Sequence, residues 1–243
     1  MTTDLPLTCF FFVAVWQLWR WLDQPHWAAI LLAGIAAGLA MASKYTGLLI
    51  WPVVVGILLI YPAQDGVSWR RRAVMLIGMA ASAMMVLWAL YSFDFGPIAA
   101  LPINLPLPAP FYWQQLSNTF SHIVNPADAN LAYLLGQASV QGWWYYFPIA
   151  LAVKTPLPTL ILALAGLFLM AWRRLWWRQS VLWAPVLAFL VLALTGALTI
   201  GYRHMLPAIP FLIMLTGNVV AADTVGQISA PGGNRARRRP FLL

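Results

Sequence analysis

The chain has no glutamate, one cysteine and few charged residues of either sign. Charged side chains make up 8% of its 243 residues, whereas ordinary soluble domains carry about 25%. This scarcity argues against a soluble globular protein. The single cysteine, Cys9, excludes an internal disulfide. The sequence also contains no HExxH, GxSxG, GxxxxGK[ST] or CxxC pattern, so these common catalytic and metal-site signatures are absent.

Long apolar runs dominate what remains. Hydrophobic residues account for 62% of the chain and the mean hydropathy is +0.78. We therefore predict an all-α fold, a polytopic helical membrane protein with about seven membrane segments of roughly 20 residues or fewer. The expected segments are Leu5–Trp19, Trp27–Ser43, Thr46–Pro62, Ala73–Phe93, Trp143–Trp172, Val181–Ile200 and Met205–Ala222.

One long connection and a basic tail interrupt or follow these segments. Residues 94–142 contain six prolines up to Pro126, and this number excludes a continuous helix. The aromatic run Phe111–Trp113 favours a structured loop lying against the membrane. We therefore expect a single transmembrane domain over 1–222, with an external loop at about 94–142. Residues 223–243 form a basic cytoplasmic tail that we expect to lack regular structure.

The basic residues predict the orientation. If the chain crosses the membrane at each segment, eleven of the fourteen Lys and Arg residues fall on one face. The positive-inside rule assigns that face to the cytoplasm. The start of the chain, the proline-rich loop and the connector Gly201–Leu206 then lie outside. Because the basic residues stand in short clusters between apolar runs, we predict no nucleic-acid partner.

Four charged residues fall at or near apolar segment ends on the predicted outer side: Asp4, Lys44, Lys154 and Arg203. Charge at membrane depth is costly and persists mainly where it binds a ligand or lines a wet cavity. A cationic pocket at the outer rim suits an anionic headgroup such as a lipid-linked phosphate, and an arginine fork can bind phosphate through two hydrogen bonds.

Each candidate has a plainer alternative. Lys154 lies beside Pro156, and a lysine there could simply extend its amine to the interface. Lys44 and Tyr45 could form a connector with an interfacial anchor. Asp4 could cap the first helix, and Arg203 could be an ordinary interfacial arginine. His204 adds a group that could donate a hydrogen bond or titrate.

Other polar residues give weaker signals. Asp94 and Asp128 could bind a metal or act as a base, but their spacing favours solvated loop residues. His122 is equally unspecific, and His26 lies on the predicted cytoplasmic side with Asp23. We predict no cofactor and no metal site, and the sequence leaves a divalent ion open.

Several motifs occur in a consistent order along residues 2 to 215. They are Thr3-Asp4-Leu5-Pro6-Leu7, Gly38-Leu39-Ala40-Met41-Ala42-Ser43-Lys44-Tyr45-Thr46, Gly142-Trp143-Trp144-Tyr145-Tyr146-Phe147-Pro148 continuing to Lys154-Thr155-Pro156-Leu157-Pro158, and Arg203-His204-Met205-Leu206-Pro207-Ala208-Ile209-Pro210-Phe211. In this order the chain resembles the GT-C class of polyprenyl-phosphate-dependent glycosyltransferases, and within it the bacterial relatives of protein O-mannosyltransferases and aminoarabinose transferases.

The resemblance implies a membrane enzyme of the hexosyltransferase type in a bacterial inner (plasma) membrane, with its site facing the periplasm or exterior. Such an enzyme moves a sugar from a polyprenyl-phosphate donor to a lipid, glycan or protein acceptor. Carried over by position, Lys44, Lys154 and Arg203 contact the donor phosphate, Asp4 lines the site, and Tyr45 and His204 stand beside them. Fixed cations there would stabilise the charge that develops on the departing phosphate.

One expected part of the family is missing from the matched segment. The family's catalytic acid usually comes from a first external loop that precedes the Asp4 motif, so we expect an N-terminally truncated relative whose base lies upstream of Met1. The catalytic residue is therefore unknown. The alternative functions are a non-catalytic membrane protein that binds the carrier lipid, and a lipid transporter.

Overall fold

The computed structural model describes residues 3–62, 67–98, 106–124, 132–134, 136–139, 143, 145–194 and 202–228. Most of them are helical. The helices are α1 Asp4–Asp23, α2 Trp27–Ser43, α3 Ile50–Ile60, α4 Trp69–Leu90, α5 Pro110–Val124, α6 Tyr146–Lys154, α7 Leu157–Trp172, α8 Ser180–Leu194 and α9 Ile209–Ile228, with 3₁₀ segments η1 Tyr45–Leu49 and η3 Tyr202–Ala208.

Two short antiparallel pairs of strands complete the described structure. β1 Phe95–Pro97 pairs with β2 Pro106–Pro108, and β3 Ala132–Leu134 pairs with β4 Gln137–Ser139. The predicted all-α membrane fold is confirmed, because the strands are only three residues long and lie in the predicted external loop.

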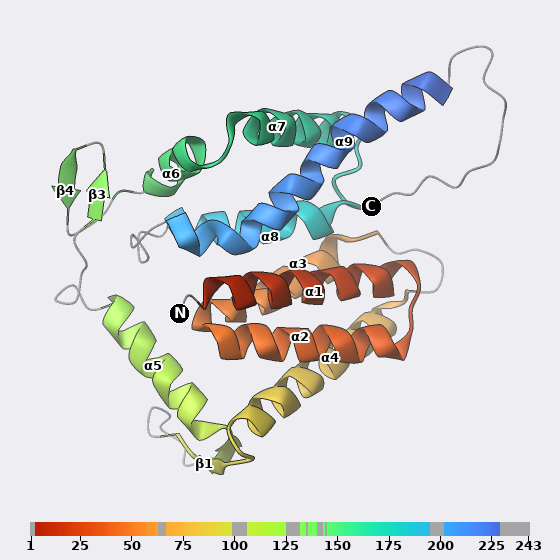
Figure 1. Cartoon of the computed structure of the whole chain (residues 1–243). Coiled ribbons are helices and arrows are strands. Elements are labelled where there is room, and N and C mark those ends of the chain that lie inside the picture. The colour runs from red at the N-terminus through yellow and green to blue at the C-terminus, as the bar shows by residue number, and fades with distance from the viewer. Residues whose placement is uncertain are drawn as a thin grey trace.

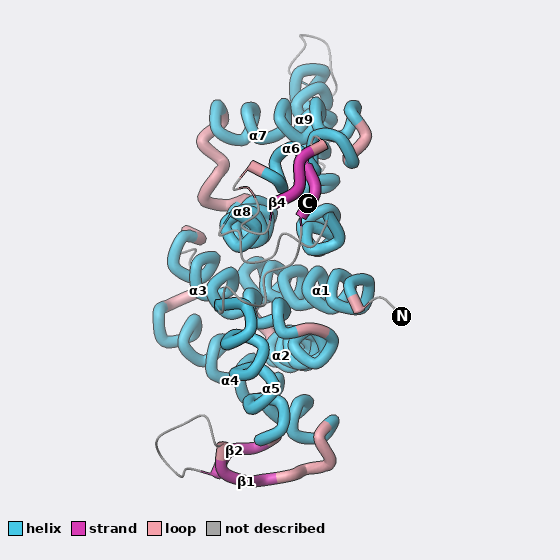
Figure 2. Tube along the Cα trace, turned by 90° about the vertical axis from the view of Figure 1, so that its left-hand side faces the viewer, coloured by secondary structure: helices cyan, strands magenta, loops and turns pink. Residues whose placement is uncertain are grey.

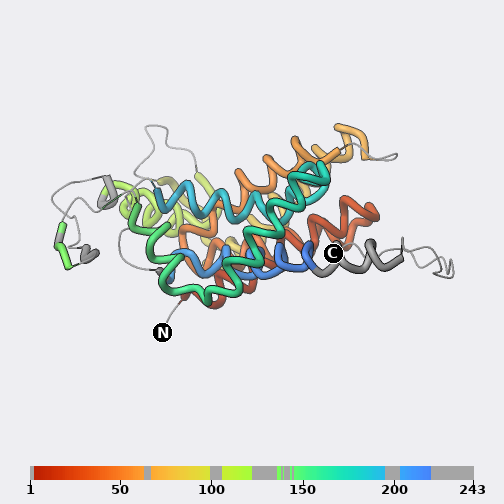
Figure 3. The backbone as a smooth tube through the Cα atoms, turned by 90° about the horizontal axis from the view of Figure 1, so that it is seen from above, coloured from red at the N-terminus to blue at the C-terminus, as the bar shows by residue number. Residues whose placement is uncertain are grey.

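The helices stack in layers (Figure 1). In that view α7 and α9 lie at the top and α8 beneath them, followed by α1 and α3 and then by α2 and α4. Seen along the helices, α5 and the β1–β2 pair lie at one end of the stack (Figure 2). Seen from above, most of the helices run roughly along the long axis of the molecule (Figure 3).

The structure describes fewer long apolar helices than the seven predicted membrane segments. Among the described residues, α1 and α4 are long and apolar enough to cross a bilayer. The predicted segment Trp143–Trp172 is broken into α6 and α7, which meet at 116°. Pro156 and Pro158 explain the break, because proline removes a backbone donor and restricts the residue before it. The bent pair, taken as one span, brings the number to three.

The other predicted segments match the observed helices to different extents. α2 has the predicted bounds, whereas Thr46–Pro62 divides into η1 and α3. α8 ends at Leu194, and residues 195–200 of the predicted Val181–Ile200 lie outside the described residues. α9 continues to Ile228, six residues beyond the predicted boundary at 222. The prediction of about seven spans therefore stays a prediction.

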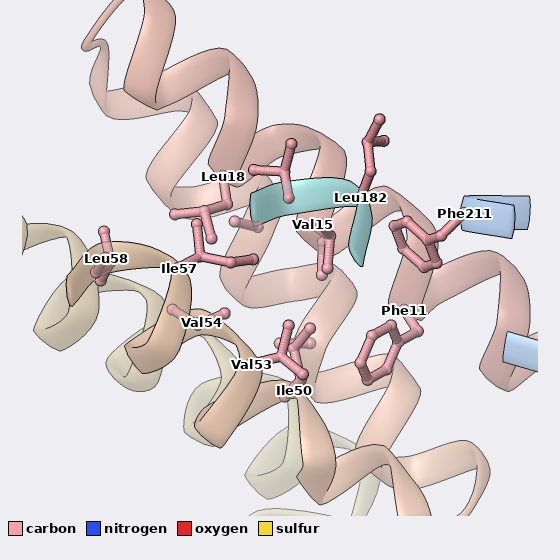
Figure 4. Packing of buried hydrophobic residues seen from close by; sticks show 14 of the residues in the cluster. Phe11, Val15, Leu18, Ile50, Val53, Val54, Ile57, Leu58, Leu182 and Phe211 are labelled. Atoms are coloured by element: carbon pink, nitrogen blue, oxygen red, sulfur yellow. The ribbon is translucent and has the colours of Figure 1, made fainter. Parts of the chain in front are cut away.

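The apolar core lies where α1, α3, α8 and α9 meet (Figure 4). Phe11 of α1 is fully buried and packs edge-on against Phe189 of α8, with ring centroids 5.1 Å apart. Phe211 of α9 also packs edge-on against the Phe11 ring, with the centroids 6.4 Å apart. Edge-to-face aromatic pairs at these distances add to the stability given by apolar burial, so they hold the two halves of the stack together.

Small residues bring α2 and α4 into close contact. A Cβ atom at Gly38 would lie 2.7 Å from the carbonyl oxygen of Ala83 on α4, and Gly34 makes a similarly close approach one turn earlier. Helices in lipid associate through such close packing, because apolar side chains gain little by leaving an apolar solvent. The Gly34-x-x-x-Gly38 spacing therefore sets the distance between α2 and α4.

Candidate functional site

One end of the stack brings together side chains from three elements far apart in the sequence. α1 begins at Asp4, the returning helix α2 ends directly before Lys44, and η3 between α8 and α9 carries His204 (Figure 1). Lys44 Nζ donates a hydrogen bond to Asp4 Oδ1 at 2.5 Å and lies 3.3 Å from His204 Nδ1. We call Asp4, Lys44 and His204 the charged cluster.

The chain turns sharply at Lys44. This residue is extended, with φ −163° and ψ 144°, and its N–H still donates to Ala40 O at the end of α2. The following 3₁₀ segment folds back so closely that a Cβ atom at Gly47 would lie 2.8 Å from the Met41 nitrogen. Glycine is needed where two backbones approach in this way. The turn directs the Lys44 side chain to the N-terminal end of α1.

Asp4 is only 5% exposed. It stands in the first turn of α1, where the helix dipole favours a negative charge. Thr3 occupies the N-cap position, so Asp4 is not the capping residue that the sequence left as an alternative. A buried carboxylate is costly unless it is paired. The ammonium of Lys44, whose side chain is 22% exposed, supplies that partner.

The geometry of the cluster indicates which ring nitrogen of His204 carries the proton. Lysine can only donate hydrogen bonds, so the nearby Nδ1 accepts and the proton of the neutral ring lies on Nε2. Burial and the charge of Lys44 lower the pKa of His204 to about 4, although Asp4 raises it and Arg203 lowers it further. His204 is therefore neutral at pH 7. Its buried Nε2 has no hydrogen-bond partner among the residues that the structure describes.

The remaining predicted site residues lie around this cluster or apart from it. Arg203 is exposed in η3, directly before His204. Lys154 is exposed in the last turn of α6, where a positive charge suits the helix dipole. It does not belong to the charged cluster. The structure thus brings Asp4, Lys44 and His204 together, while the binding roles of all the predicted site residues stay predictions.

Tyr45 belongs to an aromatic group beside the cluster. Its ring centroid lies 5.5 Å from that of Tyr112 on α5, and Tyr91 at the end of α4 lies 6.0 Å from Tyr112. Tyr112 is 1% exposed, and its hydroxyl has no hydrogen-bond partner within the described part of the chain. Burial, reinforced by the two neighbouring tyrosines, raises the pKa of Tyr112.

Tyr112 is not among the site residues predicted from the sequence. The aromatic run Phe111–Trp113 predicts a loop lying against the membrane, whereas in the structure Pro110 begins a 15-residue helix. Proline in the first helical turn together with apolar residues at helical spacing is the signal that was available. Tyr112 is the fully buried residue of this helix within the described side chains, so it attaches α5 to the bundle.

The weaker candidates gather no further chemistry. Asp94 is exposed and its Oδ1 accepts a hydrogen bond from the Phe95 N–H at 2.9 Å. Asp128 and the side chain of His122 lie outside the described residues. Across the part of the chain that the structure describes, no three His, Cys, Asp or Glu side chains gather as a metal-ligand set.

Comparison with known proteins relates the N-terminal part of the chain to a protein family. Residues 1–91 match the model of the dolichyl-phosphate-mannose-protein mannosyltransferase family. No curated protein and no solved structure matches the chain. The matched part contains α1 to α4 and therefore Asp4, Lys44 and Tyr45, whereas Lys154, Arg203 and His204 lie beyond it. The match points to a membrane glycosyltransferase of the GT-C type.

Proposed function

We propose that this chain forms the donor-phosphate site of a membrane glycosyltransferase, which moves a sugar from a polyprenyl phosphate to an acceptor on the outer face of the membrane. The observation that carries the proposal is the charged cluster. Two of its three residues, Asp4 and Lys44, lie in the part that matches the family, and this supports a polyprenyl-phosphate-linked donor and a membrane setting.

The charges of the site favour an anion. Asp4 is neutralised by Lys44, His204 is neutral, and Arg203 adds an exposed positive charge in the adjacent turn. The partly exposed Lys44 and the Arg203 guanidinium are donors only. A lipid-linked phosphate held there would receive charge-assisted hydrogen bonds, which are about twice as strong as neutral ones.

His204 fits the same role as a donor. Its Nε2–H is buried and lacks an acceptor, and a buried donor left without a partner costs about 1–3 kcal/mol. An oxygen of the donor phosphate would satisfy it after a small movement of η3. In this proposal His204 donates a hydrogen bond and does not act as the base.

A transfer assay tests the proposal. Purified protein in nanodiscs receives a panel of polyprenyl-phosphate sugars, and both donor binding and sugar transfer are measured. Lys44→Ala and Arg203→Ala should each weaken donor binding about tenfold or more, as expected for loss of a hydrogen bond to a charged group. Arg70→Ala, at an exposed position in the first turn of α4, should leave binding unchanged. If Lys44→Ala and Arg203→Ala bound the donor as tightly as the control Arg70→Ala and the wild type, the assignment would be refuted.

A second function is favoured by the pairing of Asp4. Its Oδ1 is bonded to Lys44, so the one acid of the cluster is engaged and the transfer base is not identified. A non-catalytic membrane protein that binds the carrier lipid has the same cationic end. Donor binding without transfer would support this function, and transfer by the chain would support the enzyme.

A further inference from the structure

A two-part groove lies at the end of α1 opposite the charged cluster. Its first part has a volume of about 270 Å³ and is lined by apolar side chains of α1, α8 and α9, among them Phe12, Phe211 and Met214. Its second part, of about 240 Å³, is lined by polar residues that include Arg20, Asp23 and Gln24. Taken together, the two parts have a volume within the range of typical ligand pockets, which is roughly 300–1,000 Å³.

Two tryptophans join the parts. Trp16 and Trp19 line both the apolar and the polar compartment, so the two lie side by side. The Arg20 guanidinium lies over the Trp16 ring, 5.4 Å from its centroid, and its Nη1 donates to Gln17 Oε1 at 3.4 Å. These contacts hold the cation at the junction, where the apolar groove ends and the polar pocket begins.

The depth of the groove matches one leaflet of a bilayer. α1 has 20 residues and is therefore about 30 Å long, close to the thickness of the hydrocarbon core. Phe12 lies near its middle, so the apolar groove extends from the bilayer centre towards one surface. Arg20 and Asp23 then lie at headgroup level, and tryptophans such as Trp19 are typical of this interface.

The order of charges along α1 selects the headgroup. From the bilayer centre outward, the groove presents apolar side chains, then the cation of Arg20, then the anion of Asp23 about 4.5 Å further along the helix axis. Arg20 and Asp23 form no ion pair with each other, since the ion pair found among the described residues joins Lys44 and Asp4. Both charges can therefore face a ligand.

We propose that this groove binds a membrane phospholipid with a phosphoethanolamine headgroup. The acyl chain lies in the apolar part, the phosphate bonds to Arg20, and the primary ammonium bonds to Asp23. A headgroup without an ammonium leaves Asp23 facing the anionic phosphate. A quaternary ammonium has no N–H to donate to the carboxylate. The site is separate from the donor-phosphate site and does not depend on it.

Native mass spectrometry of the full chain tests the proposal. Protein in detergent receives an equimolar mixture of phosphatidylethanolamine, phosphatidylglycerol and phosphatidylcholine with identical acyl chains. We expect the wild type to retain phosphatidylethanolamine several-fold over the other two. Equal retention of the three lipids, or a preference for either of the others, would overturn the proposal.

Variants separate the two charges. Arg20→Gln should lower retention of phosphatidylethanolamine about tenfold, while the control Arg173→Gln, an exposed arginine at the C-terminal end of α7, should not change it. Asp23→Asn should bring the ratio of phosphatidylethanolamine to phosphatidylglycerol close to one. Met214→Trp, which fills the apolar part, should lower retention of all three lipids. If Arg20→Gln and Asp23→Asn both retain the three lipids as the control Arg173→Gln does, the groove does not bind the phosphoethanolamine headgroup.

Discussion

Replacing Lys44 with methionine should raise the pKa of His204. In the wild-type protein, burial and the nearby ammonium of Lys44 lower this pKa from 6.5 to about 4. Methionine is similar in length to lysine and carries no charge. The variant therefore removes a repulsive charge, and it leaves Asp4, which favours the protonated ring, without its partner.

The size of the effect follows from the contact distance. Nζ of Lys44 lies 3.3 Å from Nδ1 of His204, and two unit charges at about that separation repel by about 5 kcal/mol at an effective dielectric constant of about 20. This value is a ceiling, because the imidazolium charge is spread over the ring and solvent reaches Lys44, which is 22% exposed. We expect a rise of about 1–2 pH units, equal to about 1.4–2.7 kcal/mol.

Nuclear magnetic resonance of ¹⁵N-histidine protein in detergent micelles measures this pKa. The chain has three histidines, and the variants His26→Gln and His122→Gln assign the other two. The same spectra distinguish the tautomers, and we expect the wild-type ring to carry its proton on Nε2 at pH 7. Arg203→Gln should raise the pKa by less than Lys44→Met, because Arg203 has a smaller effect on His204.

An unchanged or lower pKa of His204 in Lys44→Met would refute this reasoning. It would mean that Lys44 does not act on the ring, and that burial alone keeps the imidazole neutral. A wild-type ring protonated on Nδ1 would equally contradict the inferred hydrogen bonding, since Nδ1 could then not accept from an ammonium group.

Further predictions concern stability. Gly38→Leu should lower the melting temperature by an amount corresponding to about 1–3 kcal/mol, because its side chain meets the α4 backbone; Gly56→Ala, with open space around it, should not. Arg72→Met should lower the free energy of unfolding, measured by chemical denaturation, by about 3 kcal/mol. Arg72 is buried and donates hydrogen bonds to the Leu58 and Tyr61 carbonyls at the end of α3. The control Arg70→Met, at an exposed position, should change this free energy little. Lowering the pH from 6.5 towards 4 should lower the melting temperature. In this range His204 takes up a proton in the unfolded chain but not in the folded one. In His204→Gln this part of the pH dependence of the melting temperature should disappear.

The helices were largely predictable because the signals are local. The bounds of α2 follow from the apolar run between His26 and Lys44, and α4 follows from the run behind the arginine triplet. The break between α6 and α7 could be anticipated from Pro156 and Pro158 but not its angle of 116°, which depends on what each half packs against. α5 was missed because the prolines around it obscure a helix that Pro110 in fact begins.

The site was predictable in composition and not in geometry. Charged residues at the ends of apolar runs indicated Asp4, Lys44 and Arg203 without any contact in view. That Asp4 and Lys44 bond directly, that Lys44 approaches Nδ1 of His204, and that Lys154 lies outside this set depend on packing across 160 residues of sequence. No local pattern encodes such distances.

The sequence alone determined that this is a helical membrane protein and which end of each helix is charged, because apolar length and charge position are properties of single segments. The tertiary structure alone decided which charges neutralise one another and which hydrogen-bonding groups are left buried without a partner. Those outcomes depend on how α1, α2 and η3 meet, and the energies of charges and hydrogen bonds change steeply with distance and with exclusion of water.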